Sequence, residues 1–240
     1  MFSDKSSRSP WEMNGHIRSA LFMGIFVCGV APTSALADVV VSSAATSNVI
    51  CSSGVCTPTS PDAVLNVNDL ETMLGSSNVK LAAAGEPVDI DVDASITWAS
   101  TNTLTLDSYH STNIVQPVAV AGGGGLTLVT NDGGSGGTFF FGPKGNVTFW
   151  NLSSSLSING NAYTLVGDIA TLAHDVANNV SNFYALANSY DATPDGTYTT
   201  SPVPAISTLE GLGNTISHFS IDTNARYSIA SLIAVANVNV

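Results

Sequence analysis

The sequence predicts an all-β chain that folds as a parallel β-helix with one or two short helices. Three observations support this: short stretches of alternating apolar residues, turns rich in Gly, Asn and Asp between them, and one alternating stretch whose pattern slips by a residue. Short strands joined by corners and tight turns are what a coil of parallel β-structure requires. An antiparallel β-sandwich also needs many short strands, so it remains the alternative fold.

The alternating stretches occupy the middle of the chain. In 88–93 the residues Val88, Ile90 and Val92 fall on one face of an expected strand. Five further stretches alternate in the same way, namely 95–98, 102–107, 125–130, 145–150 and 155–158. The aromatic residues of the segments TFFFG and TFW are expected to fill the interior of the coil.

The slip occurs in the stretch 208–222, which reads TLEGLGNTISHFSID. Ile216 and Phe219 are three residues apart, whereas Phe219 and Ile221 are two apart. A flat strand cannot keep both spacings on one face, because its side chains alternate with a period of two. The spacing therefore predicts a corner between two short strands at Ser217 and His218.

Two short helices are expected, at 66–74 and 168–179. Asn68 or Asp69 is the expected N-cap of the first helix, and Gly75 follows its end. The second helix has four apolar residues at helical spacing. Each helix leads into a strand-like stretch, and Asp69 and Asp168 occupy matching places in the two units.

The N-terminal segment 1–37 has the pattern of a secretory signal peptide. A basic start precedes the apolar run 20–30, and the small-x-small sequence 35–37 follows it. The run is shorter than the roughly 20 residues that span a bilayer. We therefore expect cleavage between Ala37 and Asp38, export by the general secretory route, and a secreted or cell-surface location.

The rest of the chain is expected to have three parts. These are a small polar leader at 38–62, a first β-helix unit at 63–164 and a second unit at 165–240. The apolar stretch 228–240 is expected as a strand without the polar cap that closes natural solenoids. The chain is therefore expected to be truncated, or to self-associate through this C-terminal edge.

The charge and the cysteines narrow the function classes. The formal net charge is -12 with only six Lys and Arg, which excludes the clustered basic surface of a nucleic-acid-binding protein. Cys51 and Cys56 can form a small disulfide in an oxidising compartment, and two free thiols are the alternative. No further soft ligand lies near them in sequence for a zinc site.

Few residues point to catalysis or metal binding. Asp89, Asp91 and Asp93 are expected on one strand face, about 7 Å apart, as a solvated acidic face or, less favoured, a Ca²⁺ site. Ser135 lies in a G-x-S-x-G pattern without the strand and helix of a nucleophile elbow, which makes it a turn residue. The remaining candidates, His110, His174 and His218, share no motif. We therefore expect no catalytic residues and no bound cofactor.

Several stretches resemble large bacterial exoproteins of the filamentous-haemagglutinin and autotransporter-passenger type. They include ITWASTNTLTLDSYHSTNIVQPVAVAGGGGLTLVTNDGGSGG at 96–137 and LEGLGNTIS at 209–217, which is similar to GLUG-type repeats of surface proteins. The chain lacks the Asn-Pro-Asn-Leu element that two-partner secretion domains usually carry.

The resemblance implies a right-handed parallel β-helix that is non-enzymatic and adhesin-like, and that binds a protein or glycan ligand on a host or environmental surface. A polysaccharide-acting enzyme on the same coil is one alternative function. The other is an inactive fragment of a larger exoprotein.

Overall fold

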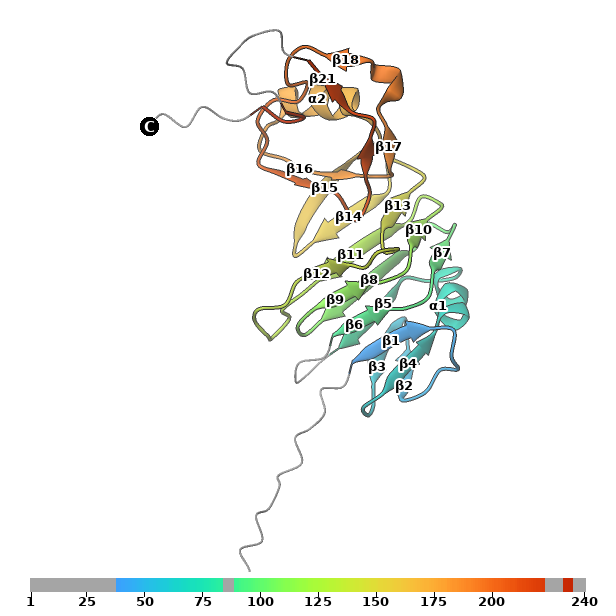
Figure 1. Ribbon diagram of the computed structural model, residues 1–240. Coiled ribbons are helices and arrows are strands. Elements are labelled where there is room, and N and C mark those ends of the chain that lie inside the picture. The colour runs from blue at the N-terminus through green and yellow to red at the C-terminus, as the bar shows by residue number, and fades with distance from the viewer. Residues whose placement is uncertain (1–37, 84–88, 223–230, 235–240) are drawn as a thin grey trace, which may run out of the picture. The chain divides into compact units, whose positions relative to one another are not determined.

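The computed structural model describes residues 38–83, 89–222 and 231–234, which all fall within one compact unit (Figure 1). The expected signal peptide, with Ala37, lies outside the described residues, as does most of the expected C-terminal strand. The fold is mostly β, and nearly all strand pairs are parallel. Only two antiparallel pairs of strands occur among the described residues. The antiparallel sandwich is therefore the wrong alternative.

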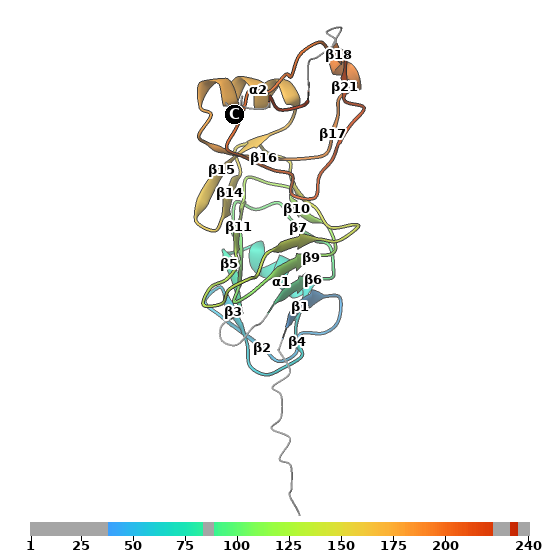
Figure 2. The same ribbon diagram turned by 60° about the vertical axis from the view of Figure 1, so that its left-hand side comes forward.

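In the middle of the chain, successive strands belong to three different sheets in a fixed order, and this order occurs three times (Figure 1 and Figure 2). The first sheet contains β6, β9 and β12, the second β7, β10 and β13, and the third β8, β11 and β14. Their bounds are β6 Ile90–Val92, β7 Ile96–Trp98, β8 Thr103–Ser108, β9 Thr112–Ile114, β10 Val118–Val120, β11 Gly125–Val129, β12 Phe139–Phe141, β13 Val147–Phe149 and β14 Ser155–Ile158.

The first two passes repeat with a period of 22 residues, since β6 to β9 runs from 90 to 112, β7 to β10 from 96 to 118, and β8 to β11 from 103 to 125. Identical side chains therefore meet in register. Leu104 pairs with Leu126, Leu106 pairs with Leu128, and all four are fully buried. The alternation seen in the sequence thus becomes a ladder of apolar side chains along the interior of the sheets.

The N-terminal part adds five strands and one helix to these sheets. Its elements are β1 Val39–Ser42, β2 Val49–Ser52, β3 Val55–Pro58, β4 Ala63–Asn66, α1 Val67–Leu74 and β5 Val79–Ala83. The expected polar leader at 38–62 therefore contains three strands, because Val39, Val41 and Cys56 are buried in the core. Their sequences, VVVS, VICS and VCTP, lack the regular alternation of the middle strands, so the pattern did not reveal them.

The two expected helices are present, but the N-cap of the first is not the expected one. Asn66 caps α1, because its side chain accepts hydrogen bonds from the backbone N–H groups of Asn68 and Asp69. Asp168 caps α2 (Ile169–Asn178) through the N–H of Thr171. Asn66 is therefore the N-cap that corresponds to Asp168, and the expectation that Asn68 or Asp69 caps the first helix is wrong.

The C-terminal part begins with the antiparallel hairpin β14–β15, which reverses the chain direction in the third sheet. Parallel pairs follow: β15 with β16, β16 with β19, β17 with β20, β18 with β21, and a bridge from Val203 to Ile233. The bounds are β15 Asn161–Val166, β16 Phe183–Leu186, β17 Tyr190–Asp191, β18 Thr197–Tyr198, β19 Thr208–Glu210, β20 Ile216–Ser217 and β21 Ser220–Ile221, with a short 3₁₀ helix η1 at Thr193–Asp195.

The corner expected at Ser217 and His218 is confirmed. His218 lies between β20 and β21 with a φ of 53°, in the left-handed region that turns a chain sharply. The two strands pair with different partners, β17 and β18.

Buried apolar side chains form two clusters. The first lies within the three-sheet region and includes Leu165 and Ala185, whereas the second gathers around α2 and includes Val166 and Leu186. Neighbouring residues of β15 and β16 thus belong to different clusters, so both faces are buried at the C-terminal ends of these strands. No helix in the described part of the chain has the length and apolar character that crossing a membrane requires.

Candidate functional site

The acidic row expected on one strand face lies on β6 and beside its ends. Asp89 and Asp91 are partly exposed and Asp93 is exposed, while Ile90 and Val92 between them are buried. The carboxylate of Asp91 accepts a 2.7 Å hydrogen bond from Nδ2 of Asn113, its partner on β9. The pass that contains β9 therefore binds the acidic row of the pass before it.

The pKa of Asp91, the central residue of this acidic row, is raised. Burial raises the pKa of Asp91, the hydrogen bond from Asn113 opposes this, and repulsion from Asp38, Asp93 and Asp89 adds to the increase. Among the described residues, no group of three or more His, Cys, Asp or Glu is arranged to hold a metal ion. A Ca²⁺ site at this row therefore stays a prediction from the sequence.

Asp89, His110 and Ser111 come together, and they are the residue types of a catalytic triad. Oδ1 of Asp89 lies 2.8 Å from Nδ1 of His110, and Oγ of Ser111 lies 3.0 Å from the same nitrogen. A proton relay needs the carboxylate and the hydroxyl on opposite ring nitrogens. Ser111 is also buried, and its Oγ accepts a hydrogen bond from the N–H of Thr138. This geometry suits a structural link between two passes.

The other histidines bind separate partners. Nδ1 of His174, on α2, lies 3.2 Å from Asp175, and Nδ1 of His218 lies 2.9 Å from Asp191. Both are largely exposed. The structure therefore brings no two of His110, His174 and His218 into one hydrogen-bonded group of the described chain.

A hydrogen-bonded cluster of Tyr190, Tyr198 and Asp195, which the sequence patterns did not indicate, holds η1 in place. The hydroxyl groups of Tyr190 and Tyr198 donate to the two carboxylate oxygens of Asp195, at 2.5 and 2.9 Å. The hydrogen bond to Asp195 raises the pKa of Tyr190 to about 12, and burial, followed by the bond to Asp195, raises that of Tyr198 to about 12. Both phenols stay protonated near neutral pH, as donors that tie η1 to β17 and β18.

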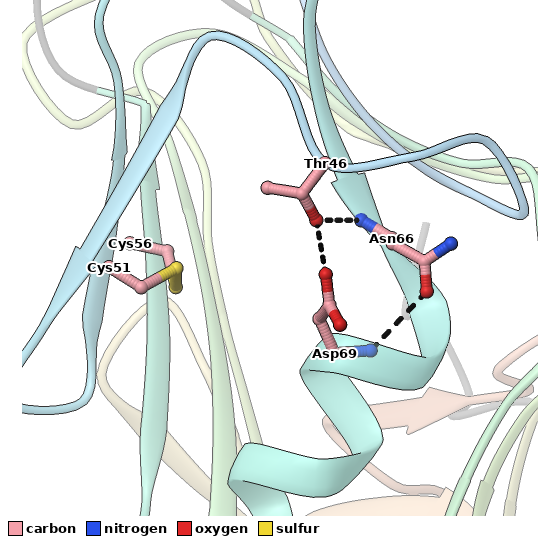
Figure 3. Close-up of a disulfide and its surroundings, with 5 residues drawn as sticks. All are labelled: Thr46, Cys51, Cys56, Asn66 and Asp69. Atoms are coloured by element: carbon pink, nitrogen blue, oxygen red, sulfur yellow. Dashed lines mark hydrogen bonds between the residues drawn. A yellow bond between two sulfur atoms is a disulfide. The ribbon is translucent and has the colours of Figure 1, made fainter.

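The hairpin β2–β3 contains the disulfide. Cys51 and Cys56 are directly opposite each other in the hairpin and are covalently joined, as the sequence pattern indicates (Figure 3). Cys56 is fully buried in the first cluster, whereas Cys51 is exposed. The disulfide therefore fastens the hairpin at one end of the third sheet.

A hydrogen-bond network beside the disulfide closes one edge of the first sheet (Figure 3). Thr46 Oγ1 accepts from the backbone N–H of Asn66 at 2.9 Å and donates to the carboxylate of Asp69 at 2.6 Å. Ser47 and Val64 exchange two backbone hydrogen bonds. The outward backbone groups of the edge strand β4 are thereby paired, and α1 is fixed at its N-terminus.

Helix α1 covers the corresponding edge of the second sheet. The backbone N–H of Thr97, on β7, donates to the carboxylate of Glu71 at 2.7 Å. Side chains of Ser100 and Asn102 donate to the carbonyl oxygen of Leu74, at 2.6 and 2.7 Å. The last carbonyl of the helix is thus satisfied by the corner that follows β7.

The opposite edge of the second sheet, β13, is closed by the turn 211–214. The N–H of Val147 donates to the carbonyl of Leu212, and Nδ2 of Asn214 donates to the carbonyl of Val147 at 2.8 Å. Nδ2 of Asn188 donates to the carbonyl of Phe149, also at 2.8 Å. Leu212 itself is fully buried in the first cluster. The glycine-rich turn that precedes β20 is therefore an edge closure.

Two aromatic side chains depart from the expected interior positions. Phe149 is fully buried as expected, but Trp150 is 71% exposed and Phe140 is 55% exposed. The residues alternate between the two faces of a strand, so the neighbour of an inward aromatic residue must point outward. The expectation that the TFFFG and TFW segments lie inside is wrong for these two residues.

Ser135 lies in the loop 131–138, where Nδ2 and Oδ1 of Asn131 bind the backbone of Gly137. The strand β12 follows this loop, and Ser135 is exposed. The arrangement is that of a turn residue.

No protein-family model, no curated protein and no solved structure matches this chain. The resemblance to filamentous-haemagglutinin and autotransporter-passenger proteins therefore stays a prediction from the sequence.

Proposed function

We propose that this chain is an exported, adhesin-like scaffold with the fold of a right-handed parallel β-helix, and that it binds a surface ligand without catalysis. The observation that carries the proposal is the threefold passage through the same three sheets, with parallel pairing in register. Such stacking gives each pass the same outward positions, which creates an extended surface for contacts. The binding role is an analogy with the exoproteins that the sequence resembles.

The side chains that point outward from the sheets form a surface with few charged groups, which supports a binding role. Along the third sheet they include Thr105, Thr127 and Ser157, which lie in register on β8, β11 and β14. The closed sheet edges and the disulfide suit a protein that works outside the cell, where disulfides persist. The expected signal peptide provides the route of export.

The titratable groups of the described chain support a non-enzymatic role. Asp89, His110 and Ser111 lack the relay geometry, and Tyr190 and Tyr198 bind a structural carboxylate. A lyase of the β-helix type needs a basic residue beside its acidic set. Lys80 instead forms an ion pair with Asp107, whose side chain is 8% exposed.

The proposal is tested with secreted material and with recombinant residues 38–240, the expected mature chain. N-terminal sequencing of the secreted protein should give Asp38 as the first residue. The recombinant chain should bind immobilised cells, matrix proteins or glycans in a saturable manner and leave every glycan intact. Failure to bind any of these surfaces, at concentrations up to those that reveal weak adhesion, contradicts the proposal.

The rival function is a polysaccharide-acting enzyme, for which the raised pKa of Asp91 is the one favourable observation, because a general acid at neutral pH needs such an increase. Incubation with acidic and neutral glycans, with and without Ca²⁺, separates the two. Turnover that is lost in Asp91→Asn but kept in Asp132→Asn, a change in an exposed loop, would establish the enzyme.

A further inference from the structure

Trp150 is the most exposed of the large apolar side chains in the described chain, at 71%, and Leu152 beside it is 49% exposed. Both lie in the corner between β13 and β14. Because burying a tryptophan gives a large gain of free energy, an indole held in water stands out even among the other exposed apolar side chains, such as Phe140 at 55%. Trp residues are also the residues most enriched among those that dominate binding energies.

The corner is a fixed part of the scaffold. The N–H of Trp150 donates to the carbonyl of Val120 at 3.0 Å, and Oγ of Ser154 donates to the carbonyl of Gly122 at 3.1 Å. Oδ1 of Asn151 accepts from both the N–H and the Oγ of Ser153, at 2.9 and 2.7 Å. The residues on either side of the indole are therefore held before any ligand arrives, which lowers the entropic cost of binding.

The corner segments of the preceding passes are closely packed, and a Cβ at Gly124 would lie 2.7 Å from Nε1 of the buried Trp98. A Cβ at Gly122 would collide with the carbonyl of Ala99, and one at Gly123 would meet Thr101 and Nδ2 of Asn151 at 3.8 and 3.9 Å. The exposed Gly123 thus lies between a threonine methyl and a side-chain amide. Thr101 and Asn151, the residue after Trp150, therefore flank Gly123 at the same corner.

The chemistry of the corner favours an uncharged ligand. The three stacked corner segments, 99–102, 121–124 and 150–154, contain no Asp, Glu, Lys, Arg or His. Oδ1 of Asn151 is occupied by Ser153, so its Nδ2 is oriented to donate, and Thr101 supplies a hydroxyl that donates and accepts. The net charge of -12 repels anionic ligands at long range.

We propose that the Trp150 corner, defined as Thr101, Gly123, Trp150, Asn151 and Leu152, binds a neutral glycan. The indole and Leu152 cover the apolar C–H face of a sugar ring, while the amide of Asn151 and the hydroxyl of Thr101 bind its hydroxyl groups. This proposal rests on the binding role proposed above and names its ligand class. A protein partner fits less well, because stable protein interfaces bury about 800 Å² on each side, and the corner offers two large apolar side chains.

The test uses the intrinsic fluorescence of residues 38–240, which contain two tryptophans. Trp98 is 3% exposed and Trp150 is 71% exposed, so a change in emission on titration reports the Trp150 corner. The probes are linear oligosaccharides of β-1,4-glucan, β-1,3-glucan, β-1,4-xylan and β-1,4-mannan, with oligogalacturonate as the anionic comparison. At least one neutral series should shift the emission to shorter wavelength and protect it from quenching by acrylamide, equally at low and high salt.

Variants then assign the site, with calorimetry as the readout because Trp150→Ala removes the fluorophore. Trp150→Ala should weaken binding at least tenfold, whereas Trp150→Phe should keep part of it. Phe140→Ser is the matched control, because it removes an exposed aromatic residue from another sheet and should leave binding unchanged. Circular dichroism and the melting temperature should be the same for all three variants.

Each possible outcome of these experiments either supports or overturns the proposed site. Equal affinity of Trp150→Ala and the parent chain overturns the site while adhesion through another surface stands. Tighter binding of oligogalacturonate than of the neutral glycans, or no binding of any neutral series, also overturns it. Light scattering that shows a dimer lost in Trp150→Ala would instead identify the corner as a contact between copies. Hydrolysis of a bound glycan would overturn the non-enzymatic function but leave the site.

Discussion

Asp91 lies half-buried on the outer side of β6, with the carboxylates of Asp38, Asp89 and Asp93 close enough to repel it. Asn113 stabilises its charged form through one hydrogen bond, but burial outweighs this bond, and the pKa is raised. The carboxylates of the outward acidic row therefore repel one another, and the hydrogen bond from Asn113 in the next pass offsets part of this repulsion.

This raised pKa predicts how stability depends on pH at one residue. A carboxyl group whose folded-state pKa lies above its unfolded value favours the folded state at low pH, and this contribution is lost as pH rises through the folded-state pKa. Asp91→Asn removes the charge and keeps an acceptor for Asn113. We expect it to raise the melting temperature at pH 7 and to have no effect near pH 3.

The measurement is thermal unfolding of Asp91→Asn and of Asp132→Asn, which makes the same change of net charge in an exposed loop. Only Asp91→Asn should show the pH-dependent gain. A lower melting temperature for Asp91→Asn at pH 7 than for the parent would show that the charged form of Asp91 is favourable.

Among the elements, β13 shows how a sheet edge is closed without another strand. Asn214 donates to the carbonyls of Val147 and Leu186, and Asn146 donates to Oδ1 of Asn214 at 3.3 Å. The side chain of Asn214 thus binds the outward carbonyl of Val147, while the backbone carbonyls of Leu212 and Ala187 accept from the N–H groups of Val147 and Phe149. Unpaired edges invite association, so this closure keeps the second sheet finite.

Asn214→Ala removes these donors and leaves partly buried carbonyl groups without partners, which costs about 1–3 kcal/mol. We expect a loss of that size in the free energy of unfolding by urea. Asn161→Ala, at an exposed position of β15, is the matched control and should change stability by less than about 0.5 kcal/mol. Equal stability of the two variants would mean that water replaces Asn214 at no cost.

The hairpin β2–β3 lies at one end of the third sheet and is closed by a disulfide bond. Cys51 and Cys56 enclose a short loop, for which the chain-entropy model gives about 2 kcal/mol of stabilisation. Reduction should therefore lower the unfolding free energy of residues 38–240 by about that amount. The double variant Cys51→Ser with Cys56→Ser should match the reduced protein and be insensitive to reductant. A parent chain unaffected by reduction would show that hydrogen bonds alone fix the hairpin.

At the scale of the whole molecule, parallel pairing continues into the last described residues. Ile233 forms a parallel bridge with Val203, as β20 does with β17 and β21 with β18. The described C-terminal part therefore adds a second pass on the first one. Self-association through the C-terminal edge remains a prediction from the sequence.

We expect light scattering of residues 38–240 to show a mass that increases with concentration. Ile233→Lys should abolish the increase, because a charge on an edge strand opposes pairing. Trp150→Ala is the control, since the corner lies on another part of the chain and should not affect the mass. A parent chain that stays monomeric at high concentration contradicts the prediction.

Local pattern was enough to locate most of the middle strands, though not β9 and β10, and to locate both helices and the corner at His218. Side-chain alternation and helical spacing are properties of neighbouring residues, so they can be read along the chain. The same reasoning placed Asp89, Asp91 and Asp93 on one face and indicated the pair Cys51 and Cys56. It also narrowed the expected ligand chemistry, because so few basic residues are present.

The sequence alone did not reveal contacts between distant residues. Asn214 closes β13 across 67 residues, and the three strands within 38–62 exist because later strands bury Val39, Val41 and Cys56. Likewise, Trp150 lies outside because Phe149 occupies the interior. By itself the sequence determined both helices and the strands with clear alternation, because these depend on local spacing. Only the tertiary structure decided which strands pair, which edges close and which aromatic residue meets the solvent, because these depend on residues far apart in the chain.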